Sequence, residues 1–159
     1  MDRIVLEFVN LFCAGVFAGM EFVVWFGVRA PLNVLDEQPH IQVRQALIRR
    51  LRVLVPAAFV LTAISGVGVA VLEGTSPGFV FRCAGVLAVL TWSLATFSGT
   101  VPINVAVLTW RPDAPPENWK GIIKRWERLD TVRTWAALTA FARFSTAVAL
   151  QLPGAPARH

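Results

Sequence analysis

The chain has 159 residues, a length that suits one compact domain and is short for two. Hydrophobic residues make up 55% of it and charged residues only 16%, whereas soluble domains average about 25% charged residues. This composition excludes a disordered chain, a coiled coil, a collagen-like fibre and a secreted disulfide scaffold, and it predicts a membrane protein.

Four stretches are apolar enough to cross a bilayer, which takes about 20 mostly apolar residues per helix. They lie at about 4–28, 54–72, 79–110 and 132–152. The first stretch is too long for the apolar part of a signal peptide, so we interpret it as a span. We therefore predict an all-α integral membrane four-helix bundle over residues 1–152, followed by a flexible tail at 153–159.

Most of the 15 lysines and arginines lie in two segments, 29–52 and 111–133. The positive-inside rule then predicts that both segments are cytoplasmic and that both termini lie outside. The net charge of +5 is explained by this asymmetry, which favours a multi-pass protein of the inner (cytoplasmic) membrane. Contact with anionic lipid headgroups is expected, and nucleic-acid binding is not.

The two cytoplasmic segments are not loops throughout. No helix breaker interrupts the chain between His40 and the second span, so that helix is expected to begin near Ile41. A second helix is expected to open at Pro115-Pro116-Glu117 and to continue through the fourth span. The helices should therefore project from the cytoplasmic face of the membrane.

A short internal sequence repeat suggests two parallel helical hairpins. Ala30-Pro31-Leu32-Asn33-Val34 resembles Val101-Pro102-Ile103-Asn104-Val105, and each segment precedes a basic stretch. Such a repeat would place sites at the interface between the halves. Each proline would also free carbonyl groups near the cytoplasmic end of its helix, although Pro31 could simply end the first helix.

Glu21 is the most informative single residue. It lies about two turns inside the cytoplasmic end of the first span, where a carboxylate is costly and indicates a functional site. It is interpreted as a general base, or alternatively as part of a packing ion pair with Arg29, Arg52 or Arg133.

Trp25 and Arg29 follow Glu21 at i+4 and i+8, so the three are expected on one helix face. An acid, an aromatic wall and a cation on one stripe could bind a planar anionic or enolisable molecule. Alternatively, Trp25 is a packing aromatic and Arg29 only follows the positive-inside rule.

Asn104 lies close to Pro102 inside the third span. Its amide could donate to an oxyanion or hold the carbonyls that the proline frees. Asn33 is the equivalent residue in the first half, nearer to water.

One face of the last helix carries Trp119, Ile123, Trp126, Asp130 and Arg133 at spacings of 4, 3, 4 and 3. This pattern predicts one of two arrangements. Either the face is a packing stripe that ends in an Asp130–Arg133 salt bridge, or Trp126, Asp130 and Arg133 close the cytoplasmic end of the bundle over Glu21.

His40 is the only histidine outside the tail, and it is interpreted as a structural residue or a substrate contact.

A solvated face against the headgroups is expected from four arginines: Arg44, Arg49, Arg50 and Arg52. Of these, Arg49 and Arg52 could turn inward. No Glu-x-x-His, Walker, Rossmann or Cys-x-x-Cys motif is present, so no metal or cofactor is expected.

Together these segments resemble the anthrone-oxygenase-like family of small membrane proteins. The resemblance lies in 21–33, in Gly99-Thr100-Val101-Pro102-Ile103-Asn104, and in Trp119 followed by Arg125-Trp126-Glu127-Arg128 and Val132-Arg133-Thr134. It implies four transmembrane helices and, in characterised members, oxidation of polyketide anthrones by dioxygen without a dedicated cofactor. Many relatives have histidine where this chain has Asp130, so the substrate or the proton transfer could differ.

The leading hypothesis is a membrane oxidoreductase for a small hydrophobic aromatic molecule. Glu21 would remove a proton, and Arg29 or Arg133 with Asn104 would stabilise the enolate; Glu21→Gln should then abolish turnover. The competing hypothesis is a non-enzymatic protein that binds a lipid or hydrophobic ligand, and a homodimer is compatible with both. The candidate catalytic residues are Glu21, Arg29, Asn104, Asp130 and Arg133, and the candidate substrate-binding residues are Trp25, Asn33, His40 and Trp126.

Overall fold

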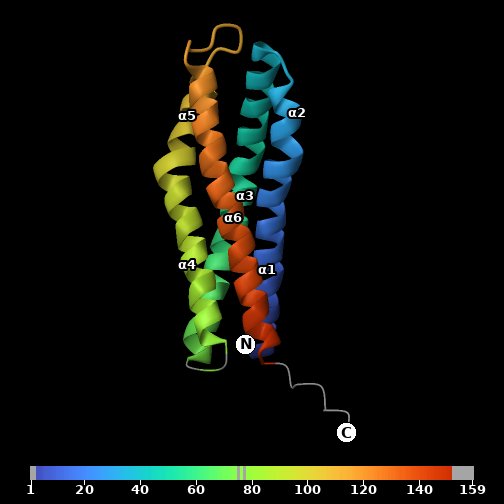
Figure 1. The fold of residues 1–159 in the computed structure, drawn as a ribbon, viewed down its shortest axis with the longest axis vertical. Helices are drawn as coiled ribbons and strands as arrows, with labels where there is room; N and C mark the ends of the chain where they lie inside the picture. Colours follow the sequence, from blue (N-terminus) through green and yellow to red (C-terminus); the bar gives the residue numbers. More distant parts are fainter. Residues whose placement is uncertain (1–2, 75, 77, 152–159) are drawn as a thin grey trace.

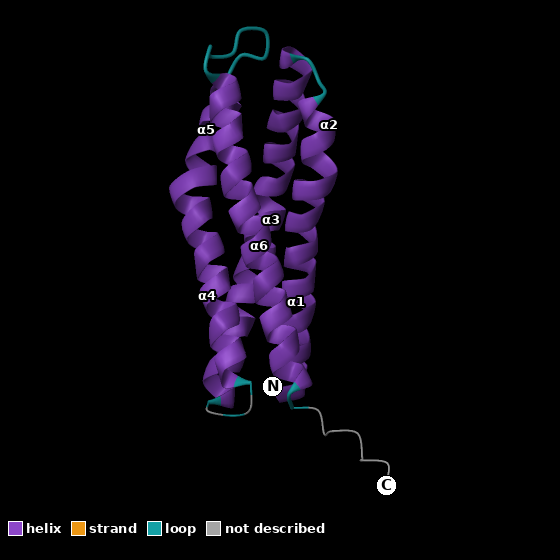
Figure 2. Cartoon of the chain, viewed as in Figure 1, coloured by secondary structure: helices purple, strands orange, loops and turns teal. Residues whose placement is uncertain are grey.

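The protein is described by a computed structural model that covers residues 3–74, 76 and 78–151. Within this part of the chain the regular structure is all helical, with no strand (Figure 2). The helices form four long stretches that lie side by side (Figure 1). The start of the first stretch and the end of the last lie at one end, and the connections at 34–36 and 110–118 lie at the other. We call these the terminal end and the loop end.

Eight elements make up the four stretches, and two of them, η1 and η2, are single π-helical turns. The predicted tail at 153–159 lies outside the described residues. In chain order the elements are α1 (Arg3–Val23), η1 (Val24–Val28), α2 (Arg29–Asn33), α3 (Glu37–Glu73), α4 (Phe79–Ala95), η2 (Thr96–Thr100), α5 (Val101–Thr109) and α6 (Trp119–Ala149).

Three of the stretches are long and apolar enough to cross a membrane: Ile4–Asn33, Glu37–Leu72 and Phe79–Thr109. They contain the first two predicted spans and all but the last residue of the third. α6 does not join them among the described residues, because Arg133 and Arg143 lower the hydropathy of its second half. The fourth span at 132–152 therefore stays a prediction.

Two predicted helix starts are displaced. α3 begins at Glu37, four residues before Ile41, because Pro39 lies in the first turn, where no backbone N–H is needed. α6 begins at Trp119 rather than Glu117, because the chain first makes a turn in which the Trp119 N–H donates to Pro116 O at 2.9 Å.

Small residues allow α1, α4 and α6 to pack closely toward the terminal end. Ala14, Ala88 and Ala140 form one buried cluster with Phe144. A Cβ at Gly85 would lie 2.6 Å from the Phe144 ring, so only glycine permits this approach.

Both π-helical turns precede a proline. η1 comes before Pro31 and η2 comes before Pro102. Since proline has no N–H, the carbonyls of Gly27 and Ser98 lose their α-helical donors, and each falls within a π turn. The helix continues to Asn33, so the interpretation that Pro31 ends it is wrong.

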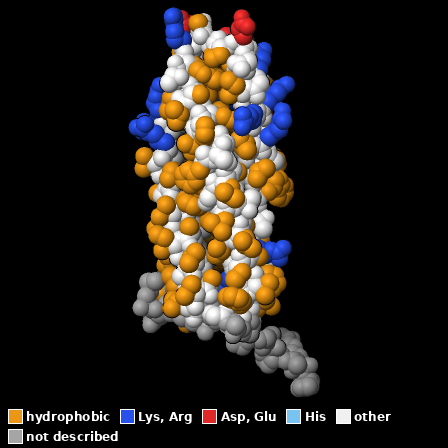
Figure 3. All heavy atoms as spheres, turned by 90° about the vertical axis from the view of Figure 1, so that its left-hand side faces the viewer, with side chains coloured by type: hydrophobic (Ala, Val, Ile, Leu, Met, Phe, Trp, Pro, Cys, Tyr) orange, Lys and Arg blue, Asp and Glu red, His pale blue; other side chains and the backbone are white. Residues whose placement is uncertain are grey.

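The surface is divided along its length. Large apolar side chains are exposed on every stretch, while lysine and arginine gather toward the loop end (Figure 3). The exposed basic residues near that end are Arg49, Arg50, Arg52, Arg111, Lys120, Lys124, Arg125 and Arg128.

Candidate functional site

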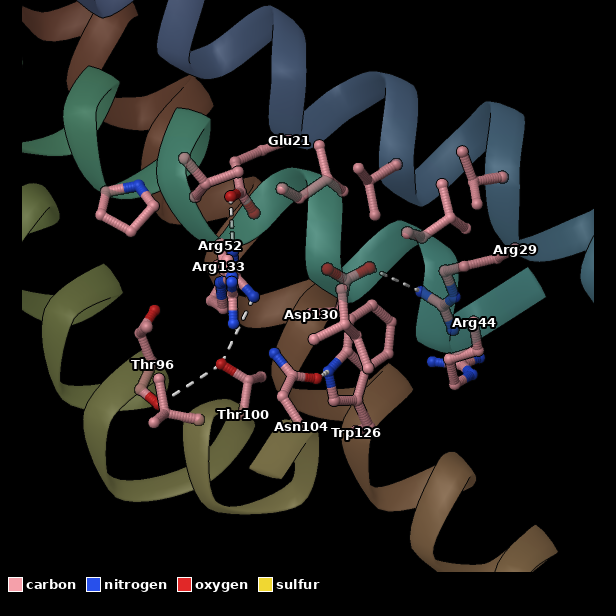
Figure 4. Close-up of a pocket in the computed structure, with 18 of the residues that line it drawn as sticks. Glu21, Arg29, Arg44, Arg52, Thr96, Thr100, Asn104, Trp126, Asp130 and Arg133 are labelled. Atoms are coloured by element: carbon pink, nitrogen blue, oxygen red, sulfur yellow. Dashed lines mark hydrogen bonds and ion pairs between the residues drawn. The ribbon is translucent and has the colours of Figure 1, made fainter. Parts of the chain in front are cut away.

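A cavity of about 380 Å³ lies between the four helical stretches, in the half of the molecule nearer the loop end. Every stretch contributes to its wall (Figure 4). Apolar side chains of α3 and α5, such as Ile48, Leu51 and Leu108, form much of the lining, and charged side chains approach from α1, α2, α3 and α6. The cavity therefore suits a mainly apolar molecule with a few polar groups.

The exposed residues of the lining indicate that the cavity opens between α3 and α5. Arg52 on α3 and Val101 and Val105 on α5 line it and are also exposed, Val105 by 61%. Both helices belong to stretches that could cross a membrane. A hydrophobic molecule could therefore enter from the side rather than from an end.

The two π-helical turns shape opposite walls of the cavity. Val24 and Val28 come from η1, and Thr96 and Thr100 come from η2. Because a π turn changes the rotational phase of the helix, residues on either side of it do not keep the simple i, i+4 spacing. Glu21 and Arg29 both line the cavity, whereas Trp25 between them does not.

At the deep end of the cavity, Glu21 and Arg133 form a buried ion pair. Arg133 Nη2 donates to Glu21 Oε1 at 2.6 Å, and its Nη1 donates to Thr100 Oγ1 at 3.3 Å. The Arg133 guanidinium also lies over the Trp92 ring, 4.8 Å from its centroid. Glu21 is only 2% exposed, and its second oxygen, Oε2, has no hydrogen-bond partner.

Asp130 is fully buried one turn from Arg133, and neither of its carboxylate oxygens has a hydrogen-bond partner. The predicted Asp130–Arg133 salt bridge does not form, because Arg133 turns to Glu21. Arg29 Nη1 approaches Asp130 Oδ2 to 3.9 Å, too far for a hydrogen bond. Asp130 is therefore a buried carboxylate that is free to accept a proton or a hydrogen bond.

Burial raises the pKa of Asp130 to about 7, although the positive charge of Arg133 opposes this shift. The negative charge of Glu21 raises the pKa further, and Arg29 and Arg44 lower it. Asp130 lies outside the three candidate spans and two residues before the predicted fourth. A carboxyl group with this pKa exchanges protons near neutral pH.

Arg29 is tied to α6 by several groups. Its Nη1 donates to Thr131 Oγ1 at 2.9 Å, and its Nη2 lies 3.7 Å from Glu127 Oε2. Trp25 Nε1 also donates to Thr131 Oγ1, at 3.3 Å, and the Trp25 ring packs edge-on against Trp135. Trp25 thus joins α6 to η1 and lies outside the cavity.

Arg44 reaches the cavity from α3, although the sequence placed it on a solvated face. It is 3% exposed, so that expectation is wrong for Arg44, while Arg49, Arg50 and Arg52 are exposed. Arg44 Nε donates to His40 Nε2 at 3.3 Å, and its guanidinium lies 4.7 Å from the centroid of the Trp126 ring. Its Nη2 has no partner.

His40 holds this arrangement without lining the cavity. Its Nδ1 lies 2.9 Å from Leu32 O, which can only accept, so Nδ1 carries the proton and Nε2 accepts from Arg44. The imidazole also packs edge-on against Trp119.

Asn104 and Trp126 are joined across the cavity wall. Trp126 Nε1 donates to Asn104 Oδ1 at 2.8 Å. Because an indole nitrogen can only donate, the amide oxygen must face Trp126, and the Asn104 NH₂ group is left as a donor on the other side. Asn33, the residue that echoes Asn104, is exposed at the end of α2 and does not line the cavity.

Within the described residues, no group of three or more His, Cys, Asp or Glu side chains is arranged to hold a metal ion.

A model of the anthrone oxygenase family matches residues 45–143, which is more than half of the chain. The chain belongs to the anthrone oxygenase family. The match includes Asn104, Trp126, Asp130 and Arg133, and it begins after Glu21 and the other cavity residues of α1 and α2. No curated protein and no solved structure matches the chain.

In this member of the anthrone oxygenase family, six of the nine predicted site residues line one cavity: Glu21, Arg29, Asn104, Trp126, Asp130 and Arg133. Trp25, Asn33 and His40 do not. The predicted inward face of α6 is confirmed, since its five residues are buried or half-buried.

Arg44 was not predicted as a site residue from the sequence. A signal was available, because Ile41, Arg44, Ile48, Leu51 and Val55 follow the 3–4 spacing of a buried helix face. Trp92 and Thr100, which contact Arg133, were not among the predicted site residues, although Thr100 lies in a segment that carries the family resemblance.

Proposed function

We propose that this family member is a membrane oxygenase that oxidises a small hydrophobic aromatic molecule, such as a polyketide anthrone, with dioxygen. The observation that carries the proposal is the cavity itself, in which two buried carboxylates keep free oxygens beside apolar walls. Membership of the anthrone oxygenase family supports the substrate class.

A position in the inner membrane would explain the surface and the opening of the cavity. The exposed apolar residues would face lipid, and the basic residues near the loop end would contact anionic headgroups on the cytoplasmic side. Both termini would then lie outside. The opening between α3 and α5 would admit a substrate that is dissolved in the bilayer.

The reaction balances without any group beyond substrate and dioxygen. A base removes one proton from the anthrone CH₂ group, which gives an aromatic enolate. The enolate transfers an electron to dioxygen, and recombination at that carbon forms a C–O bond and a hydroperoxide. Loss of the second proton from the carbon and cleavage of the O–O bond then yield a ketone and water.

Asp130 is the better placed of the two carboxylates to take the first proton. Both of its oxygens lack hydrogen bonds and its pKa is raised to about 7, whereas Glu21 is held by Arg133 at 2.6 Å. This differs from the expectation that Glu21 is the base. Glu21 would instead orient Arg133 and, through its negative charge, keep Asp130 basic. The free NH₂ group of Asn104 would donate to the substrate carbonyl.

Oxygen uptake by the purified protein with a panel of anthrones tests this proposal. We expect uptake above a protein-free blank, loss of uptake in Asp130→Asn, and retained uptake in Glu21→Gln. Asp113→Asn is the matched control, because Asp113 is exposed and remote from the cavity. Retained uptake in Asp130→Asn with loss in Glu21→Gln would return the role of base to Glu21. The absence of uptake with every anthrone would contradict the oxygenase and favour a ligand-binding protein.

A further inference from the structure

The described residues include three buried arginines, and they differ in their partners. Arg82 lies 2.8 Å from Glu7, and Arg133 lies 2.6 Å from Glu21. Arg44 is equally buried, yet no carboxylate of the described residues lies within 4.0 Å of it. A buried guanidinium without a counter-ion is costly for folding, so this exception needs an explanation.

The contacts of Arg44 orient it without neutralising it. Its Nε donates to a neutral imidazole, and its planar face lies on the Trp126 ring. Glu127 and Asp130 act on it only at longer range, and Arg29 repels it. Its Nη2 lacks any partner and belongs to a side chain that lines the cavity.

We propose that Arg44 binds an anionic oxygen of the ligand, so that the cavity takes an aromatic molecule as its enolate, phenolate or carboxylate. This inference deepens the proposed function and rests on it for the enolate. The guanidinium supplies a charge-assisted hydrogen bond from Nη2. Trp126 supports the guanidinium from behind, and the apolar wall of α3 accommodates the body of the ligand.

Three other cations line the cavity and are less suited to this role: Arg52 is exposed rather than buried, and the remaining two already face carboxylates of the protein. Arg133 is neutralised by Glu21, and Arg29 lies between Glu127 and Asp130. The enolate partner expected from the sequence, Arg29 or Arg133, is therefore already compensated by the protein. A ligand that takes Arg44 as its counter-ion displaces no existing ion pair.

His40 is a positioning residue for this site. Leu32 O fixes the tautomer of the imidazole, and Nε2 then accepts from Nε of Arg44, which fixes the plane of the guanidinium. The backbone of α2 thus sets the direction of a side chain on α3.

Two probes that share one ring system and differ in charge test the proposal: anthracene-2-carboxylate and its methyl ester. Their affinities are measured by quenching of tryptophan fluorescence in phosphatidylcholine nanodiscs, which carry no net headgroup charge. We expect the wild type to bind the carboxylate at least about tenfold more tightly than the ester. Arg44→Met should abolish this preference, Arg44→Lys should keep part of it, and Arg50→Met, an exposed control on the same helix, should keep all of it.

Thermal stability without ligand separates this role from a structural one. Because Arg44→Met removes an uncompensated buried cation, its Tm should equal or exceed that of the wild type. Unfolding or a large fall in Tm would mean that Arg44 is structural and would overturn the proposal. Three other results would also overturn it. The wild type could bind the two probes with equal affinity, it could fail to bind the carboxylate, or Arg44→Met could lose the same amount of affinity for both probes.

The outcome is independent of turnover, since neither probe carries an oxidisable CH₂ group. A preference for the carboxylate together with no oxygen uptake from any anthrone would support the anion site and contradict the proposed oxygenase activity. Oxygen uptake without that preference would support the oxygenase activity and contradict the anion site.

Discussion

Two clusters of buried arginine and carboxylate lie toward opposite ends of the molecule, and they are built differently. Toward the terminal end, Arg82 donates to Glu7 at 2.8 Å and to Ser76 at 3.1 Å. The helices there pack on alanine and glycine, and the cavity beside Phe144 measures only about 60 Å³. Toward the loop end, the cavity measures about 380 Å³, and Asp130 and Arg44 keep polar atoms without partners.

The comparison shows where this fold supplies its own counter-charges and where it does not. A buried charge is tolerated when the protein pairs it and hydrogen-bonds it. The terminal end meets this requirement within the chain, which is typical of a structural cluster. Toward the loop end, Asp130 and Arg44 leave it unmet beside a cavity, which is typical of a binding or catalytic site.

The largest expected effect is on oxygen uptake and comes from changing Asp130, toward the loop end. Asp130→Asn should lower oxygen uptake about 100-fold or more, because a general base contributes about that much. In the wild type, uptake should rise with pH through about 7 and then level off, since Asp130 accepts a proton only when ionised. A pH–rate profile from 5 to 9 checks this, and an unchanged profile in Asp130→Asn would end its assignment as the base.

Glu21→Gln should shift that profile rather than abolish it. The negative charge of Glu21 raises the pKa of Asp130, so its removal lowers that pKa and moves the rise in uptake to lower pH. The glutamine amide oxygen would still accept a hydrogen bond from Arg133, which limits the loss of stability. A shift to higher pH would contradict the electrostatic coupling.

The equivalent change at the terminal end should affect stability alone. Glu7→Gln weakens the Arg82 pair and should lower the free energy of unfolding by about 1–3 kcal/mol. Oxygen uptake per folded molecule should stay within about twofold of the wild type. A selective loss of turnover in Glu7→Gln would contradict a purely structural role for the Arg82–Glu7 pair.

A change in packing toward the terminal end should likewise affect stability and not substrate binding. Gly85→Ala forces a methyl group against the Phe144 ring and should lower the free energy of unfolding by about 1–3 kcal/mol, with KM unchanged. Thermal unfolding and steady-state oxygen uptake measure the two quantities. An increase in KM without loss of stability would show that the terminal end takes part in substrate binding.

The smallest expected effect concerns the opening. Val105→Trp places a larger apolar side chain at an exposed position between α3 and α5, so Tm should change little. KM should rise by about tenfold or less, because one side chain narrows the entrance without touching Asp130. An unchanged KM would mean that the substrate enters elsewhere.

Much of the site could be predicted from side-chain chemistry at unusual positions. Glu21 inside an apolar helix, and Asp130 with Arg133 on one face of α6, were visible because charged residues are costly in such places. Arg44 was not, because several arginines surround it and only rotation of the helix decides which one is buried. Trp25 was misplaced relative to Glu21 because the π turn changes the spacing that an α-helix would give.

The sequence by itself determined the helical class, three stretches that can cross a membrane, and the division between an apolar and a basic part. These properties follow from local composition and periodicity, which require no knowledge of neighbouring helices. Only the tertiary structure decided which carboxylate each arginine meets. Arg133 pairs with Glu21, 112 positions away, rather than with Asp130 on its own helix, because packing of α1 against α6 brings the two side chains together. That choice leaves both carboxylate oxygens of Asp130 without a hydrogen-bond partner at the wall of the cavity.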